Sequence, residues 1–345
     1  MKDSGIEDVE NSAPLPWLLG SSLQVAGNIV KASTQFVAER AKHVDVNMKG
    51  VHSVVEELTL EKLKEITSPR AYNKDLHFVD GGPLTVQYLL VVDALNFCFW
   101  PDEELEYEHL SLGVKASLER DPTVLDAERL MWISGDEVQA LLGWPRKVPL
   151  QEERARLLRE VGGALMQHFD GQAANMVRQA GGSALALVQL LAQVCPGFRD
   201  HAVYQGHQVF LYKRAQIFVG DVYGAFGGEG LGEFWDIDQL TMFADYRVPV
   251  VLRTMGVLRY SPELEQKGAI LRGELIAAGS EEEVEVRACT VAAVEALREA
   301  IAAKYLGVPG AQLPHAIQLD WWLWELGERE RKSHPPHHRT LTVYY

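Results

Sequence analysis

Cysteine is scarce in this sequence, and its spacing argues against two common kinds of scaffold. The three cysteines, Cys98, Cys195 and Cys289, lie far apart, and each stands in an apolar run. A disulfide framework or a structural zinc site needs more cysteines at closer spacing. We therefore interpret each cysteine as a small buried hydrophobic residue and expect a reducing compartment, the cytoplasm.

Long apolar runs are also missing. No window reaches about 18 uninterrupted apolar residues, which is the length that a membrane-spanning helix requires. The first fifteen residues are acidic and polar, without the basic start and apolar stretch of a secretory signal. We expect residues 1–18 to form a flexible acidic N-terminal tail, and we expect no contact with a membrane.

Basic residues are fewer than acidic residues in this sequence. The chain has 33 basic and 48 acidic residues, a net charge of −15 at pH 7. Tight binding to duplex nucleic acid relies on cations that neutralise phosphates, so we expect no direct binding of nucleic acid. The substrate predicted by this composition is a small molecule.

Several motifs that indicate a bound nucleotide, a metal or a nucleophilic serine are absent. The sequence has no Walker loop, no GxGxxG after a strand, no GxSxG, no HExxH and no CxxC. The histidines of 333–338 are interrupted by prolines, which break the spacing that helical metal ligands need. We expect neither a metal nor a cofactor.

What the chain has in abundance is apolar residues at helical spacing. Hydrophobic residues make up 47% of 345 residues, enough for a large core. Apolar positions between 54 and 66, 151 and 169, and 291 and 305 follow one helix face, and 173–194 is typical of a buried helix. Residues 202–211 predict a hairpin, while 86–92 fits either a strand or a buried helix. The fold class is mainly α with a few short strands.

The first segment with potential chemistry is VVDALNFCFW, residues 91–100. Asp93 and Asn96 stand among aromatic residues that include Phe97 and Trp100. Aromatic faces with two hydrogen-bonding side chains suit a pocket for a flat heterocycle. An Asx cap inside a hydrophobic core explains the same spacing equally well.

The second segment is YKRAQI, residues 212–217, which opens a predicted helix over 213–226. Lys213 and Arg214 are adjacent cations at a helix N-terminus, where the helix dipole favours acids. They would be well placed to hold an anion beside free backbone N–H groups. Solvated surface charge is the alternative, and this fragment alone favours it.

The third segment is FWDIDQLTMFADYRVP, residues 234–249. Asp236 and Gln239 resemble a capping box, which predicts a helix that ends near Asp245–Arg247, before Pro249 starts another helix through about Leu258. Asp245 would lie near the C-terminus of the first helix, packed among Phe243 and Tyr246. There its pKa should be raised unless Arg247 or Lys213 compensates. A structural Asp–Arg pair is the alternative.

An aromatic run, DWWLW, covers residues 320–324. We interpret its tryptophans as core residues. Asp320 is either a helix N-cap or an acid that faces a pocket.

Six segments together resemble one known family. VVDALNFCFW, YKRAQIFVGDVYG, QLTMFADYRVP, GVLRYSPEL, EVEVRACT and LDWWLW occur in the order found in the queuosine salvage family, and the resemblance spans roughly residues 20–345. One departure is Val250, where the family usually carries glutamine.

The resemblance implies a hydrolase that cleaves the N-glycosidic bond of queuosine 5′-phosphate and releases queuine for salvage into transfer RNA. It also implies a single domain over residues 19–345, with two helical layers around a central cleft, similar to helix-hairpin-helix DNA glycosylases. The family's motifs fall on Asp245 and Lys213 as catalytic residues. The positions that match its substrate pocket, or that adjoin the motifs, are Asp93, Asn96, Phe97, Trp100, Phe243, Tyr246, Arg247 and Asp320.

This assignment is chemically consistent. A ribosyl C–N bond breaks through an oxocarbenium-like cation, which the carboxylate of Asp245 can stabilise while it activates water. The base is a 7-deazapurine that cannot be protonated at position 7, so Asp93 and Asn96 are candidates for hydrogen bonds to its other edge. Lys213 or Arg247 could bind the 5′-phosphate. The alternatives are a non-catalytic nucleotide-binding protein and a DNA-repair glycosylase.

Overall fold

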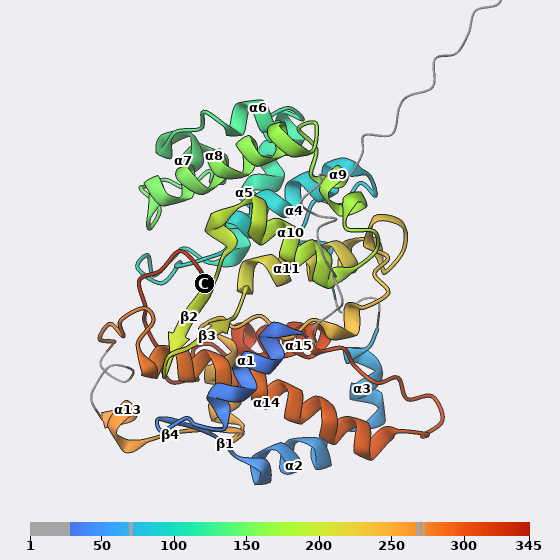
Figure 1. Ribbon diagram of the computed structural model, residues 1–345, viewed down its shortest axis with the longest axis vertical. Helices are drawn as coiled ribbons and strands as arrows, with labels where there is room; N and C mark the ends of the chain where they lie inside the picture. The colour runs from blue at the N-terminus through green and yellow to red at the C-terminus, as the bar shows by residue number, and fades with distance from the viewer. Residues whose placement is uncertain (1–27, 69–71, 267–269, 271–272) are drawn as a thin grey trace, which may run out of the picture.

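The computed structural model describes residues 28–68, 72–266, 270 and 273–345, and the expected tail over 1–18 lies outside this part. Helices dominate it (Figure 1). The helices are α1 Ile29–Ala38, α2 Met48–Glu57, α3 Leu60–Ile66, α4 Pro83–Leu95, α5 Tyr107–Arg120, α6 Ala127–Leu130, α7 Gly135–Leu142, α8 Gln151–His168, α9 Ala173–Gln179, α10 Ala184–Val194, α11 Lys213–Phe226, α12 Val248–Thr254, α13 Pro262–Gln266, α14 Glu281–Tyr305 and α15 Ala316–Arg329. The strands are β1 Val44–Val46, β2 His201–Tyr204, β3 His207–Phe210 and β4 Leu258–Tyr260.

The mainly helical prediction is confirmed, and several elements match their expected ranges. Helices α8 and α11 coincide with the periodic segments, and α14 contains the predicted 291–305. The predicted hairpin is β2 and β3, antiparallel around Gln205 and Gly206, which both have positive φ. The other sheet pairs β1 with β4. The ambiguous 86–92 belongs to helix α4, which begins at Pro83 and is buried on every side from Thr85 to Leu95.

Two expected helices are interrupted. The predicted helix over 173–194 is two helices, α9 and α10, because Gly181 and Gly182 turn the chain with φ of 62° and 76° between them. Between α2 and α3 the break falls at Leu58 and Thr59, where the Thr59 hydroxyl caps α3 by accepting the N–H of Lys62 at 3.1 Å.

The predicted helix from Asp236 to about Arg247 does not form. That segment contains only a 3-10 turn, Ile237–Gln239, and irregular chain follows to Arg247. Asp236 does not cap this turn. Its carboxylate instead accepts the N–H of Ala184 at 2.6 Å and the hydroxyl of Ser183 at 2.7 Å, so it caps α10. The second predicted helix does form: α12 has Pro249 in its first turn, as expected. It ends at Thr254 and not near Leu258, where β4 begins.

The core consists of two large hydrophobic clusters. The first gathers apolar residues of α4 to α11, the upper half of Figure 1. The second gathers α1 to α3 and α12 to α15 with the hairpin, the lower half. All three cysteines are buried free thiols, as predicted. Within the described part of the chain, no helix is both long and apolar enough to span a bilayer.

Candidate active site

A cavity of about 640 Å³, part of it open to solvent, lies where the two clusters meet. Its wall comes from the end of α4, one face of α11, the irregular chain after Leu240, α15 and the segment before α4. The lining residues are Tyr72, Asn73, Leu76, His77, Asn96, Tyr107, Lys213, Ile217, Asp221, Phe243, Asp245, Asp320, Trp321, Trp324 and Glu325.

A second cavity of about 370 Å³ adjoins the first. The two share Asn96, Tyr107, Lys213, Asp245 and Trp324 as lining residues. Both residues predicted to be catalytic therefore stand where the two cavities meet. This second cavity is further lined by Phe97, Phe99, Glu106, Tyr246, Arg247, Glu328 and Tyr345.

Asp245 is held at the N-terminus of a helix. Its Oδ1 accepts the backbone N–H of Arg247 at 3.0 Å and that of Val248 at 2.9 Å, at the start of α12. The predicted position near a helix C-terminus is thus wrong, because the preceding residues are not helical. Burial raises the pKa of the Asp245 carboxyl, while Lys213 and these backbone N–H groups oppose the shift. The Asp245 side chain is half-buried.

Lys213 is the first residue of α11 and is buried. Its Nζ donates to the carbonyl of Asn96 at 2.9 Å. Burial lowers its pKa to about 8, while Asp245 and Asp93 act in the opposite direction. Lys213 is therefore a cation that can gain or lose its proton near physiological pH.

The N-terminus of α11 does not offer the free anion site that the sequence suggested. The carboxylate of Asp200 already accepts the backbone N–H of Lys213 at 3.0 Å. Arg214, which was expected either to bind the anion with Lys213 or to be solvated, is buried. It donates to the carbonyls of Ala94 and Gly197. Arg214 thus joins α11 to its neighbours and does not line either cavity.

Two further carboxyl groups line the first cavity. Asp320 lies in the middle of α15, so it is a pocket acid and not an N-cap, and it accepts the N–H of Phe243 at 2.9 Å. Asp221 lies two turns after Lys213 on the same face of α11. Burial raises the pKa of both carboxyls well above the ordinary value, which favours their protonated form.

Asp93 is placed differently from the prediction. It is fully buried on α4 and lines neither cavity. Burial raises its pKa, against the pull of Lys213 and Arg214. Asp93 would therefore act on a ligand only indirectly, because its charge raises the pKa of Lys213, which lines both cavities.

Aromatic rings form much of the first cavity. Tyr72 lies edge-on to Trp321 with centroids 5.5 Å apart, and Tyr107 lies edge-on to Trp324 at 5.6 Å. Phe243 contributes another ring. The two tryptophans were interpreted as core residues, but on α15 they follow Asp320 on the face turned toward the cavity. Such a box of rings suits a flat base.

Two glycines of α11 make room for these rings. A Cβ on Gly220 would lie 2.7 Å from Cζ of Phe243, and one on Gly224 would lie 2.5 Å from Cδ2 of Tyr72. Real Cβ contacts are never this short, so a larger residue at either position must push the ring away. The glycines thus set the width of the cavity.

We predict that Gly220→Ala will raise the KM for substrate by roughly 10-fold, because the displaced Phe243 ring would fill space meant for the base. Gly163→Ala on α8 is the matched control, since a Cβ there meets nothing within 4 Å. It should leave KM unchanged and add about 0.5–1 kcal/mol of stability. Steady-state kinetics and thermal unfolding would measure both effects. An unchanged KM in Gly220→Ala would contradict the role given to this glycine.

The remaining predicted residues fall into three places. Asn96 lines both cavities, and Phe97, Tyr246 and Arg247 line the second. Trp100 lines neither. It packs against the small cluster that contains Phe97 and lies under the guanidinium of Arg339 at 5.5 Å.

Arg247 has carboxylate partners in the second cavity. Its Nε lies 2.6 Å from Glu328 Oε1, and a second nitrogen lies 3.8 Å from Glu106. Glu106 also pairs with Arg331. These ion pairs fix the guanidinium at the cavity wall. Among the residues that the structure describes, no three His, Cys, Asp or Glu side chains are grouped to hold a metal ion.

Several residues that line the first cavity were not predicted, although the sequence carried a signal for some of them. Asp221 stands eight residues after Lys213, and Trp324 four after Asp320, so helical spacing alone could have placed each on its partner's face. Tyr72, His77 and Tyr107 had none, because they reach the cavity from segments distant in sequence.

Comparison with known proteins gives one consistent result. Residues 76–345 match the family described as queuosine salvage protein. A relative from Dictyostelium discoideum is 42% identical, over 92% of this chain and 98% of its own length. Relatives from Sphaerobacter thermophilus and Mus musculus are 40% and 33% identical, over 92% and 91% of this chain and 97% and 98% of their own. All three are named queuosine 5′-phosphate N-glycosylase/hydrolase.

Proposed function

Because the chain belongs to the queuosine salvage protein family, we propose that it is an N-glycosyl hydrolase that cleaves queuosine 5′-phosphate and releases queuine for salvage into transfer RNA. One observation carries the proposal. Asp245 and Lys213 stand together at the junction of an aromatic, acid-lined cavity and a second cavity. The reacting ribose would lie at this junction, with the base in the first cavity and the phosphate in the second.

Asp245 has the properties that the bond cleavage requires. Departure of the base leaves positive charge on the anomeric carbon, and a half-buried carboxylate fixed beside it stabilises that charge more strongly than water does. The backbone N–H groups of Arg247 and Val248 fix Oδ1 and help to keep the group ionised. Asp245 would then take a proton from the water that attacks the anomeric carbon.

The first cavity suits the leaving base. Phe243, Trp321 and Trp324 offer faces for a flat heterocycle. A 7-deazapurine has carbon at position 7, so help for its departure must come from hydrogen bonds elsewhere. Asp221 and Asp320 have raised pKa values and can donate such bonds as neutral acids. They take the role that the sequence had suggested for Asp93, while Asn96 keeps its place at the wall.

We place the 5′-phosphate in the second cavity beside Arg247. The guanidinium is held at the wall by Glu328, with Glu106 and Arg331 close by. Lys213, which lines both cavities, would lie between phosphate and ribose and contribute charge to both. Tyr246, whose ring stacks on His337 with centroids 4.5 Å apart, and Phe97 complete this wall.

We predict that Arg247→Gln will lower kcat/KM for queuosine 5′-phosphate by roughly 10–100-fold relative to free queuosine, because a hydrogen bond to a charged group contributes about 1.5–3 kcal/mol. The free nucleoside has no phosphate to lose and serves as the internal control. Both substrates would be assayed for queuine release under identical conditions. If the ratio of kcat/KM for queuosine 5′-phosphate to kcat/KM for queuosine is the same in the variant and the unaltered protein, Arg247 does not recognise the phosphate.

We further propose that residues 19–345 act as one domain of the helix-hairpin-helix DNA glycosylase type, with the two helical layers enclosing the site. In support, the cavity takes its wall from α4 and α11 on one side and from α15 on the other. Three free, buried cysteines are consistent with the proposed cytoplasmic location.

The direct test is incubation of the purified protein with queuosine 5′-phosphate, followed by mass spectrometry. Release of queuine and ribose 5-phosphate in equal amounts, over many turnovers, is expected. Stoichiometric binding without release would instead identify a non-catalytic nucleotide-binding protein. Release of bases from damaged duplex DNA, and not from the nucleotide, would identify a repair glycosylase.

A further inference from the structure

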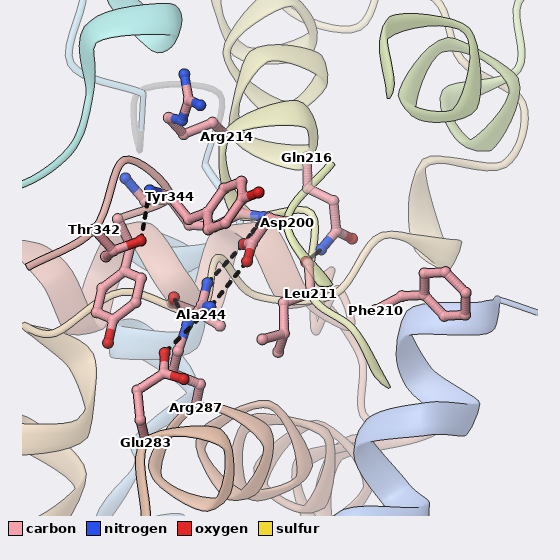
Figure 2. A network of polar contacts seen from close by, with 12 residues as sticks. Asp200, Phe210, Leu211, Arg214, Gln216, Ala244, Glu283, Arg287, Thr342 and Tyr344 are labelled. Carbon is pink, nitrogen blue, oxygen red and sulfur yellow. Dashed lines mark hydrogen bonds and ion pairs between the residues drawn. The ribbon is translucent and has the colours of Figure 1, made fainter. Parts of the chain in front are cut away.

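Outside both cavities, a buried arginine connects the two segments that carry the proposed catalytic groups. Arg287 lies in α14, and its guanidinium stands between Asp200 and Glu283 with Ala244 beside it (Figure 2). Its two terminal nitrogens donate to the Asp200 carboxylate at 2.9 and 2.6 Å. Arg287 and Asp200 are each 2% exposed. A buried pair with this bidentate geometry is rigid.

Each member of the pair also holds the main chain next to one proposed catalytic residue. Asp200 accepts the backbone N–H of Lys213 at 3.0 Å. Arg287 donates from Nε to the carbonyl of Ala244 at 3.0 Å, one residue before Asp245. The pair thus joins the start of α11 to the irregular chain that ends at α12.

The backbone before Lys213 needs such support. Tyr212 has φ 47° and ψ 38°, the left-handed region that non-glycine residues seldom occupy. Asp200 fixes this turn with its own carbonyl, which accepts the N–H of Leu211 and that of Tyr212, both at 3.0 Å. One residue therefore uses its main chain and its side chain to set the direction in which Lys213 enters the cavity.

We infer that Asp200 and Arg287 are positioning residues that hold Lys213 and Asp245 in their working geometry. This inference rests on the proposed function of those two residues. Neither Asp200 nor Arg287 lines either cavity, so they act on the substrate only through the groups that they hold. A shift of about 1 Å in a reacting group can lower a rate by roughly 100-fold, so loss of the pair should reduce kcat more than it changes KM.

The test compares three variants with the unaltered protein. Arg287→Lys keeps the charge between Asp200 and Glu283 but cannot also reach the Ala244 carbonyl. Asp200→Asn keeps an acceptor for the N–H of Lys213 but loses the ion pair. Glu285→Gln is the matched control. Glu285 is buried on the same helix, and its carboxylate accepts backbone N–H groups of Lys42 and His43, away from both cavities.

The expected result is a 10–100-fold lower kcat in Arg287→Lys and in Asp200→Asn, with KM changed by less than about 3-fold. Glu285→Gln should lose thermal stability like the other two while its folded protein keeps the full kcat. The double variant Asp200→Asn/Arg287→Lys should be no slower than the slower single variant, because the two residues act as one unit. Assays would be run well below the Tm of each variant.

Several results would overturn the inference. One is a kcat equal to that of the unaltered protein in either Arg287→Lys or Asp200→Asn. If one of these variants does not fold, the kcat of the other is sufficient for the test. Another is a loss of kcat in Glu285→Gln equal to theirs, which would mean that general destabilisation is the cause. If the unaltered protein releases no queuine, the proposed function fails as well. If the unaltered protein releases queuine and the variants are equally fast, the proposed function stands and only the positioning role of Asp200 and Arg287 is refuted.

Discussion

Asp245→Asn is expected to lower kcat for queuine release by at least about 1,000-fold, the scale on which loss of a general base or of electrostatic stabilisation slows enzymes. The substitution removes the negative charge that the oxocarbenium-like transition state needs. Its side-chain oxygen can still accept the N–H groups of Arg247 and Val248, so the start of α12 should keep its conformation. Substrate affinity should therefore remain within a few-fold of normal.

The matched control for this variant is Asp236→Asn. Asp236 is another aspartate whose carboxylate accepts backbone N–H groups at the start of a helix, α10, but it lines neither cavity. This control should leave kcat unchanged, which separates the loss of a cap from the loss of the catalytic charge. Isothermal titration and single-turnover assays would distinguish binding from chemistry. Normal turnover by Asp245→Asn would refute the catalytic role.

Lys213→Met is expected to lower kcat by roughly 100-fold or more, because the ammonium opposes the rise in the pKa of Asp245 more strongly than the other cation, Arg247, does. It should also change the pH dependence. Lys213 has a pKa of about 8 and is charged below that value. In the unaltered protein kcat/KM should thus rise as Asp245 ionises and fall as the pH passes about 8. The variant should lack the alkaline fall.

Lys304→Met is the control for this second substitution. The Lys304 ammonium donates to the carbonyls of Val55, Glu56 and Leu58, much as Lys213 donates to that of Asn96, but Lys304 lines neither cavity. Its pH profile should match that of the unaltered protein. An alkaline limb that persists unchanged in Lys213→Met would show that another group titrates.

Prediction from sequence succeeded where the signal was local. Helix α8 and the hairpin follow from apolar periodicity and a glycine turn within a few residues. The prediction failed where a side chain serves a distant partner. Asp236 resembled the cap of its own helix, yet it caps α10, more than 50 residues earlier in the chain, so the segment that holds Asp245 was given the wrong conformation.

The residues of the candidate site also divide into those that the sequence could predict and those that it could not. Lys213, Asn96 and Asp245 came from a family resemblance, and the structure brings them to one wall. Tyr72, Tyr107 and the Asp200–Arg287 pair could not be found this way. Each depends on contacts between segments far apart in sequence; Asp200 and Arg287, for example, are 87 positions apart. No local sequence pattern encodes such a contact.

The most direct test of the account is a crystal structure of Asp245→Asn with queuosine 5′-phosphate bound. The account predicts that the anomeric carbon of the ribose lies within about 4 Å of the residue 245 side chain, a distance suited to reaction. The base should lie among Phe243, Trp321 and Trp324, with the phosphate beside Arg247. An anomeric carbon more than about 7 Å from residue 245, with α12 undisturbed, would contradict the account.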